Sequence, residues 1–187
     1  MKKSKNTFKN EKNYKYWSEQ FDGYGNYMMS GKGNEYYILR NIFFSFIDDD
    51  DSILDVGCAS GGTYGQIKDQ GRNNIYKGVD YAEGFVLANR KKFPEVKWSV
   101  MDARELKEAG GTWDVVLIYD VLDALEHWEE AIDEAIRVAV KKVVIMMWMD
   151  ADMAGKRDYM RTKGLRVFEI DIEGDGIHYH KVLIGEK

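Results

Sequence analysis

The chain is poor in several kinds of residue, and each shortage excludes something. Its 187 residues include one cysteine, Cys58, so no internal disulfide can form and a reducing, cytoplasmic location is expected. No apolar stretch reaches the ~20 residues that cross a bilayer, and the polar start lacks the apolar middle of a signal peptide, so we expect no membrane segment. The formal charge of −5 provides no general attraction for nucleic acid and argues against such a substrate.

Only one proline, Pro94, interrupts the chain. From residue 51 onward, short β-rich runs alternate with helical patterns, which is typical of parallel βα units. Strands are expected at 52–57, 75–80, 96–100, 113–119, 142–148, 165–172 and 177–185. Because Glu173 to Gly176 alone separate the last two, these should form an antiparallel hairpin at one edge. The sequence therefore predicts one α/β domain over 51–187, with a mostly parallel seven-stranded sheet and helices on both faces.

Two further segments can be interpreted from their residue types. Helical spacing between the fourth and fifth strands produces one apolar stripe, formed by Trp128, Ala131, Ile132, Ala135, Ile136 and Ala139. The acidic run Asp48 to Asp51 is expected to be a solvated connector, since adjacent acids in a loop are usually exposed.

The most informative segment is ILDVGCASGG, from Ile53 to Gly62. A β-rich run ends in an acid, a glycine-rich turn follows, and a helix can begin at Thr63. Glycine allows a ligand to approach the backbone closely, and the amides that open a helix favour negative charge. An open α/β sheet builds a nucleotide-type site in this way. The spacing of Gly57 and Gly61 differs from the dinucleotide fingerprint.

This segment resembles the first motif of class I S-adenosylmethionine-dependent methyltransferases, which reads acid, any residue, Gly, any three residues, Gly. Asp55, Gly57 and Gly61 match it. The order of strands, including a final antiparallel one, is also similar from residue 51 to the C-terminus. The resemblance implies a Rossmann-like fold, S-adenosyl-L-methionine as cofactor and S-adenosyl-L-homocysteine as product.

Several residues then become candidates for holding that cofactor. Asp80 ends the second strand about 20 residues beyond the glycine turn, where a carboxylate can accept from both ribose hydroxyls. Its alternative role is to cap the following helix. Tyr81 is expected to lie against the adenine. The resemblance assigns Asp102 and Ala103 to the adenine amino group and a ring nitrogen, and the alternative for Asp102 is again a helix cap.

The glycine turn itself supplies the remaining cofactor contacts. Asp55 is expected to hold the turn and to contact the ammonium group of the cofactor. The loop is lined by Cys58, Ala59 and Ser60. We interpret Cys58 as a packing residue rather than a nucleophile, because no histidine lies close to it in sequence.

The segment after the fourth strand should face the methyl group and its acceptor. Tyr119, Asp120 and Asp123 are the catalytic candidates, and Tyr119 is also a cofactor contact. Relatives that act on small molecules often carry a histidine near positions 123–124, where this chain has none. We expect His127 to be a surface residue, and likewise His178 and His180 on the last strand.

Other functions remain open alternatives to a small-molecule or protein side-chain acceptor. A metal-dependent enzyme would use Asp120 and Asp150, but Ala151 stands where that class has Asn, so no metal is expected. A nucleic-acid methyltransferase acting on base amines would carry prolines after the fourth strand, and IYDV has none. A cofactor-binding protein without turnover is the third alternative. The oligomeric state is left open.

Residues 1–50 form an arm rich in aromatic residues. A helix is expected at 34–47, with Tyr37, Ile38, Ile42 and Phe46 packing on the sheet. In the family that the chain resembles, such an arm often closes as a lid over the cofactor. The alternative is that these aromatic residues simply cover one face of the sheet.

Overall fold

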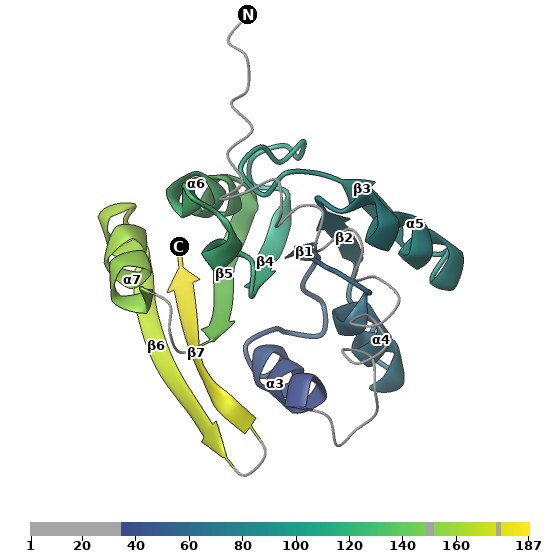
Figure 1. The fold of residues 1–187 in the computed structure, drawn as a ribbon, viewed down its shortest axis with the longest axis horizontal. Helices are drawn as coiled ribbons and strands as arrows, with labels where there is room; N and C mark the ends of the chain where they lie inside the picture. The colour runs from purple at the N-terminus through teal and green to yellow at the C-terminus, as the bar shows by residue number, and fades with distance from the viewer. Residues whose placement is uncertain (1–34, 149–151, 175–176) are drawn as a thin grey trace, which may run out of the picture.

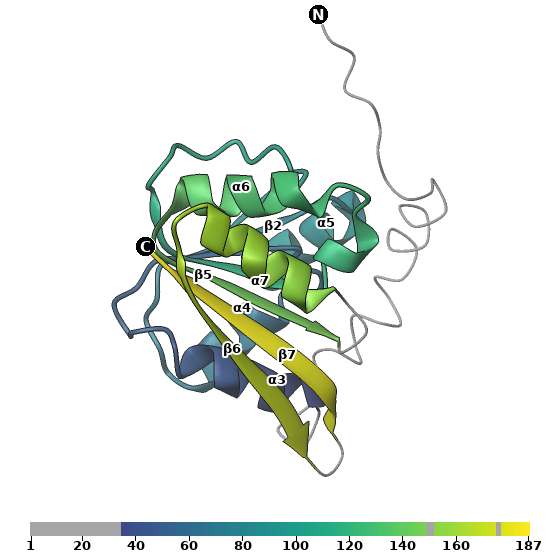
Figure 2. The ribbon, with the colours of Figure 1, turned by 90° about the vertical axis from the view of Figure 1, so that its left-hand side faces the viewer.

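The computed structural model describes residues 35–148, 152–174 and 177–187, and Figures 1 and 2 show how their helices and strands are arranged. Asp150, most of the aromatic arm and the side chain of His178 lie outside this part of the chain. No helix within it is long and apolar enough to cross a membrane.

A seven-stranded sheet forms the centre of the molecule, in the order β3-β2-β1-β4-β5-β7-β6. The parallel strands are β1 (Ile53–Val56), β2 (Tyr76–Asp80), β3 (Lys97–Val100), β4 (Trp113–Tyr119) and β5 (Ala139–Trp148). β7 (Ile177–Glu186) is antiparallel to both β5 and β6 (Arg166–Gly174). The predicted α/β fold with a C-terminal hairpin is confirmed. The strand order reverses between β1 and β4, which is where open α/β sheets bind ligands.

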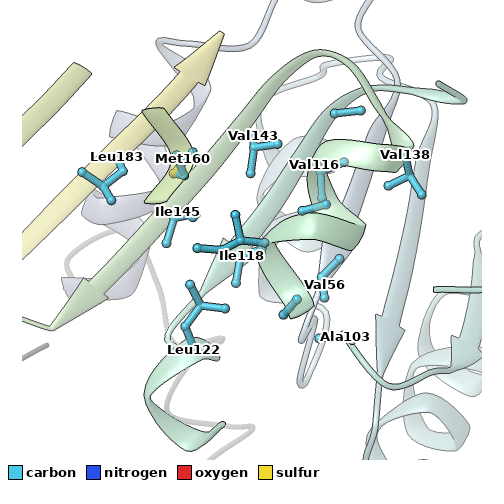
Figure 3. Close-up of a cluster of buried hydrophobic side chains, with 14 of the residues drawn as sticks. Val56, Ala103, Val116, Ile118, Leu122, Val138, Val143, Ile145, Met160 and Leu183 are labelled. Carbon is cyan, nitrogen blue, oxygen red and sulfur yellow. The ribbon is translucent and has the colours of Figure 1, made fainter. Parts of the chain in front are cut away.

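One face of the sheet is covered by α6 (Trp128–Val138) and α7 (Met153–Thr162). The predicted stripe on α6 supplies the buried Ala131, Ile132 and Ala135. They pack on alternate residues of the parallel strands, and Figure 3 shows part of this apolar cluster, including Val116, Ile118, Val143 and Ile145. Because both faces are covered, the central strands are almost continuously apolar.

The opposite face is covered by α3 (Glu35–Phe44), α4 (Gly62–Asp69) and α5 (Glu83–Lys92). The expected helix in the arm is present, but its predicted packing face is partly wrong. The buried residues of α3 are Glu35, Tyr36, Leu39, Arg40, Phe43 and Phe44. Tyr37 and Ile38 are only half-buried. The helix is rotated toward Tyr36 and Leu39, and this rotation also places a charged residue, Arg40, on the sheet side.

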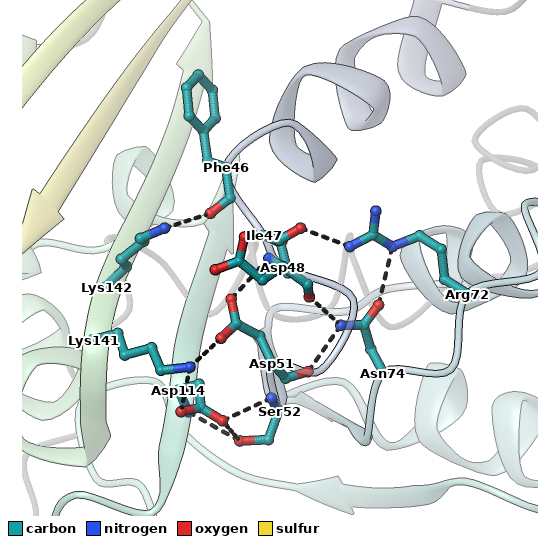
Figure 4. Close-up of polar contacts among 10 residues, drawn as sticks. All are labelled: Phe46, Ile47, Asp48, Asp51, Ser52, Arg72, Asn74, Asp114, Lys141 and Lys142. Atoms are coloured by element: carbon teal, nitrogen blue, oxygen red, sulfur yellow. Dashed lines mark hydrogen bonds and ion pairs between the residues drawn. The ribbon is translucent and has the colours of Figure 1, made fainter.

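The connector between α3 and β1 is not simply solvated, because Asp51 is fully buried. Its carboxylate accepts from Lys141 Nζ at 2.6 Å and from the Asp48 amide at 2.9 Å. Lys141 also pairs with Asp114 at 3.1 Å, and Asp114 accepts from the Ser52 hydroxyl at 2.7 Å (Figure 4). The expectation of a solvated run was therefore wrong for Asp51, whose pairing with Lys141 removes the cost of burying a lone charge.

Candidate functional site

The glycine turn after β1 adopts a backbone conformation that accounts for its residues. Gly57 and Gly61 have φ angles of 79° and 72°, in the region that glycine adopts most readily. A Cβ on Gly57 would lie 2.2 Å from Val121 Cγ2, so the segment after β4 packs directly against this turn. Ala59 also has a positive φ, of 42°. Strain in this turn is therefore confined to Ala59, while the two glycines adopt their conformations readily.

Asp80 holds this turn from the neighbouring strand. One carboxylate oxygen accepts from the Ala59 amide and the other from the Ala82 amide, both at 2.8 Å. Burial raises the pKa of Asp80 to about 6, although these amide hydrogen bonds oppose the rise. Each oxygen retains a second lone pair, so the carboxylate can shape the loop and still accept from ligand hydroxyls. Tyr81 follows it and is half-buried.

Asp102, after β3, is engaged by a neighbouring cation. Arg104 donates to its two carboxylate oxygens, from Nε at 3.0 Å and from Nη2 at 2.6 Å. Partial burial raises the pKa of Asp102, but the hydrogen bonds from Arg104 outweigh it and the net shift is downward. Ala103 is buried beside it. The side chain of Asp102 is therefore an ionised acceptor fixed in place at the strand end, which is compatible with the predicted adenine contact.

Asp55 points toward the face that α3 and α4 cover. It is 2% exposed, accepts from the Tyr76 hydroxyl at 2.6 Å, and has a pKa raised by burial. Cys58 is buried nearby, and burial raises the pKa of its thiol well above the ordinary value. The neutral thiol is a poor nucleophile, which fits its interpretation as a packing residue. The Ser60 hydroxyl is buried and has no hydrogen-bond partner within the described ranges.

The structure brings Tyr119 and Asp120 together where β4 ends. Tyr119 lies on the α3 side, with its ring centroid 5.8 Å from that of Tyr36 and 5.4 Å from that of Phe43. Its hydroxyl oxygen is buried and has no hydrogen-bond partner in the described part of the chain. Buried polar atoms are nearly always paired, so this hydroxyl stands out among the described residues.

Asp120 has a strained backbone, with a φ of 51°, and its carboxylate accepts from the Trp148 amide at 3.1 Å. Burial raises its pKa from 3.8 to about 7, with a smaller contribution from Asp123 and Glu35. Asp123 itself is exposed and lies 3.7 Å from Lys156 Nζ. Of the three catalytic candidates, Tyr119 and Asp120 share the buried side of the site, whereas Asp123 lies at its surface.

Three residues of this region, His180, Glu35 and Arg40, were not predicted from the sequence to belong to the site. The expected exposure of His180 is wrong, because its side chain is fully buried and its Nδ1 lies 3.9 Å from Glu35 Oε1. Its ring lies between those of Tyr119 and Trp148, at centroid distances of 6.3 and 5.8 Å. Arg40 is the third residue. Helical spacing places Glu35, Tyr36 and Arg40 near the sheet together, and this is the signal that was missed.

His127 is exposed just before α6, as expected. Within the described residues no group of three or more His, Cys, Asp or Glu side chains is placed to hold a metal ion. The titratable groups described in the site are carboxylates, tyrosines, one histidine, one cysteine and the arginines Arg40 and Arg104, arranged around the ends of β1 to β4.

The chain is similar to known proteins in three ways: through a family model, through a relative's sequence and through the fold of solved structures. Residues 53–142 match the family model described as "Methyltransferase domain". The EEF1A lysine methyltransferase 4 of Bos taurus is 28% identical over 118 residues, which are 62% of this chain and 46% of that protein, so the match spans about half of the relative's length.

Solved structures share the fold at low sequence identity. The N-methyltransferase NodS of Bradyrhizobium japonicum WM9, in complex with S-adenosyl-L-homocysteine, superposes with a TM-score of 0.73 at 14% identity, covering 93% of this chain and 97% of NodS. The [4+2]-cyclase SpnF superposes with a TM-score of 0.67, also at 14% identity, covering 85% of this chain and 83% of SpnF.

Proposed function

We propose, from the premise that this chain carries a class I, Rossmann-like methyltransferase domain, that it binds S-adenosyl-L-methionine and transfers the methyl group to an acceptor, releasing S-adenosyl-L-homocysteine. The observation that carries the proposal is the site at the strand-order reversal. There, a glycine turn in left-handed conformation is held by a partly buried carboxylate from the next strand.

The residues present fit such a cofactor. Asp80 would hold the ribose hydroxyls, with Tyr81 against the adenine and Asp102 and Ala103 at its edge. The turn would contact the rest of the molecule through Asp55, Gly57, Cys58, Ala59, Ser60 and Gly61. The buried hydroxyls of Ser60 and Tyr119 are polar atoms that a ligand would pair.

When bound, this cofactor supplies an electrophilic methyl group for in-line displacement. The protein's part is to align an acceptor, exclude water and manage one proton. Asp120 suits the last task, because a carboxyl with a pKa of about 7 can take a proton from the acceptor near neutral pH. Tyr119 lies beside it and would orient the acceptor through its hydroxyl group.

The acceptor that we favour is a basic nitrogen on a small molecule or a protein side chain. Asp120, Asp123 and Glu35 give this side of the site negative charge, which attracts a protonated amine. The bovine relative is named for lysine methylation, which points the same way. A nucleic-acid acceptor is disfavoured by the formal charge of −5.

A second candidate function is binding of the cofactor without methyl transfer. It is favoured by one observation, that a protein described as a [4+2]-cyclase has this same fold. Fold alone therefore does not determine the chemistry of the site.

Calorimetry with S-adenosyl-L-methionine and S-adenosyl-L-homocysteine tests the cofactor, and incubation with labelled cofactor followed by mass spectrometry of amine, peptide and protein pools tests transfer. We expect binding of both compounds and label on a nitrogen. Binding without label in any pool would favour the second candidate, and absence of binding would refute both.

A further inference from the structure

One side of the sheet carries exposed aromatic side chains next to the C-terminal hairpin. In the described part of the chain only two aromatic residues are among the exposed large apolar ones, Trp148 and Phe168, each 46% exposed. The remaining members of that group are aliphatic and lie on separate elements: Ile75, Leu87, Val100 and Val140. Single exposed aliphatic residues are ordinary on protein surfaces, so the two aromatic residues are the ones that call for an explanation.

The strand register places Trp148 and Phe168 on the same side of the sheet. Trp148 on β5 pairs with His180 on β7, and His180 pairs with Ile172 on β6. Phe168 precedes Ile172 by four residues on the same strand, so the two side chains point to the same side. This is the side that α3 covers, because His180 lies beside Glu35 of that helix.

The cover that α3 provides on this side ends before β6. Figure 1 shows α3 next to β7, with β6 on the far side of β7. Along β6 the exposure rises from Ile172, which is buried, through Ile170, which is half-buried, to Phe168. The Arg166 side chain covers part of the Phe168 ring, with its Cζ 5.2 Å from the ring centroid. We call Trp148, Ile170 and Phe168 the hairpin strip.

The hairpin strip begins at the proposed acceptor site. The Trp148 amide donates to the Asp120 carboxylate at 3.1 Å, and the Trp148 ring centroid lies 5.8 Å from that of His180. At about 3.3 Å per residue, Phe168 lies about 13 Å along β6 from the level of Trp148. A small amine held at Asp120 does not reach that far, whereas an extended polypeptide covers the distance in about four residues.

Charge and apolar surface together define the partner. Asp120, Asp123 and Glu35 make the acceptor end negative, which attracts a basic side chain. Exposed aromatic residues beside such a site are typical anchors for a protein partner. We infer that the acceptor is a basic side chain of a polypeptide, and that an apolar residue about four positions away from it packs on Phe168. This inference rests on the proposed function, and within it selects a protein acceptor over a small molecule.

Synthetic acceptors test the inference. Acetylated nonapeptide amides of glycine and serine carry one central lysine and have either phenylalanine or serine at both ends, and Nα-acetyl-lysine amide is the small acceptor. We expect the wild type to methylate the phenylalanine peptide with a kcat/KM about tenfold or more above that of the serine peptide. In Phe168→Thr, which keeps a strand-forming residue, the two values should differ by less than about twofold. Nα-acetyl-lysine amide should be methylated equally by both proteins.

Leu87→Thr is the matched control, because Leu87 is also 46% exposed but lies on α5. It should keep the preference of the wild type for the phenylalanine peptide. Equal kcat/KM values for the two peptides in the wild type, or an undiminished preference in Phe168→Thr, would overturn the inference. A dimer that Phe168→Thr dissociates in sedimentation would assign the hairpin strip to a second copy instead. An unfolding temperature lowered more by Phe168→Thr than by Leu87→Thr would assign it to the chain's own residues.

Fluorescence anisotropy of the labelled phenylalanine peptide separates this inference from the proposed function, since it measures binding without turnover. We expect binding by the wild type and about tenfold weaker binding by Phe168→Thr. That result without methylation of any acceptor would refute methyl transfer and retain the docking surface. Methylation of Nα-acetyl-lysine amide without binding of the labelled peptide would retain methyl transfer and refute the docking surface.

Discussion

The two faces of the sheet are built differently. Under α6 and α7 the buried cluster consists of apolar residues, such as Ile118 and Ile132, and Lys156 is the one charged residue that these two helices bury. Under α3 and α4 the apolar cluster is interrupted near the strand ends by Arg40 and Asp55, and His180 lies buried there as well. Burying charged groups costs free energy, and removing water from apolar surface gains it. The first face therefore contributes more to the stability of the fold, and the second gives up part of that stability to hold polar groups, which we propose that a ligand uses.

The largest expected effect tests the apolar face. Ile132→Ala removes a fully buried side chain from α6, and we expect the free energy of unfolding to fall by about 2–4 kcal/mol. Denaturant titration measures the change. The affinity for S-adenosyl-L-homocysteine, measured by calorimetry at a temperature where the variant is folded, should stay as in the wild type. A changed affinity would mean that the two faces do not have separate roles.

The next effect tests the polar face. Asp80→Ala removes the acceptor for two backbone amides and the proposed ribose contact, so affinity for S-adenosyl-L-homocysteine should fall by about 30-fold or more. Calorimetry gives the affinity, and circular dichroism checks the fold. Asp69→Ala, at the exposed end of α4, is the control. An unchanged affinity in Asp80→Ala would contradict the ribose assignment.

A pH series isolates the cost of burying Asp120. Its pKa is raised in the folded state, so the protonated form favours folding and stability is lost as the pH rises from about 4 to about 7. Asp120→Asn removes this loss, and asparagine tolerates the positive φ of 51°. Its stability advantage should grow by about 1–2 kcal/mol between about pH 5 and about pH 8. Thermal unfolding at both pH values measures it, and a constant difference would refute the raised pKa.

The strands and helices, and the glycine turn with the acids at the neighbouring strand ends, could be predicted from the sequence because they depend on local patterns. Alternation of strands and helices predicts the sheet, and the acid and glycines around Gly57 predict the turn within ten residues of chain. Asp51 illustrates what local patterns miss. β5 begins at Ala139 rather than near 142, and that earlier start is what sets Lys141 beside the buried carboxylate.

His180 and Arg40 were missed for a related reason. His180 is buried among residues far from it in sequence, including Tyr119, Trp148 and Glu35. The burial of Arg40 depends on the rotation of α3, and a sequence with several apolar positions per turn does not determine that rotation. Packing between distant elements determines the burial of both residues. The need for glycine at position 57, in contrast, follows from its own positive φ and from the closeness of Val121.

The spacing of two charged residues on α3 has one more consequence. Glu35 and Arg40 are five positions apart, and at 1.5 Å per residue their backbones are separated by about 7.5 Å along the helix axis. One lies toward His180 and the other toward Gly62, so this one helix contributes a charged residue to each of two parts of the candidate site. A one-residue insertion between them would rotate one of the two residues by about 100° around the helix axis relative to the other. It would separate the two contacts although neither residue is itself changed.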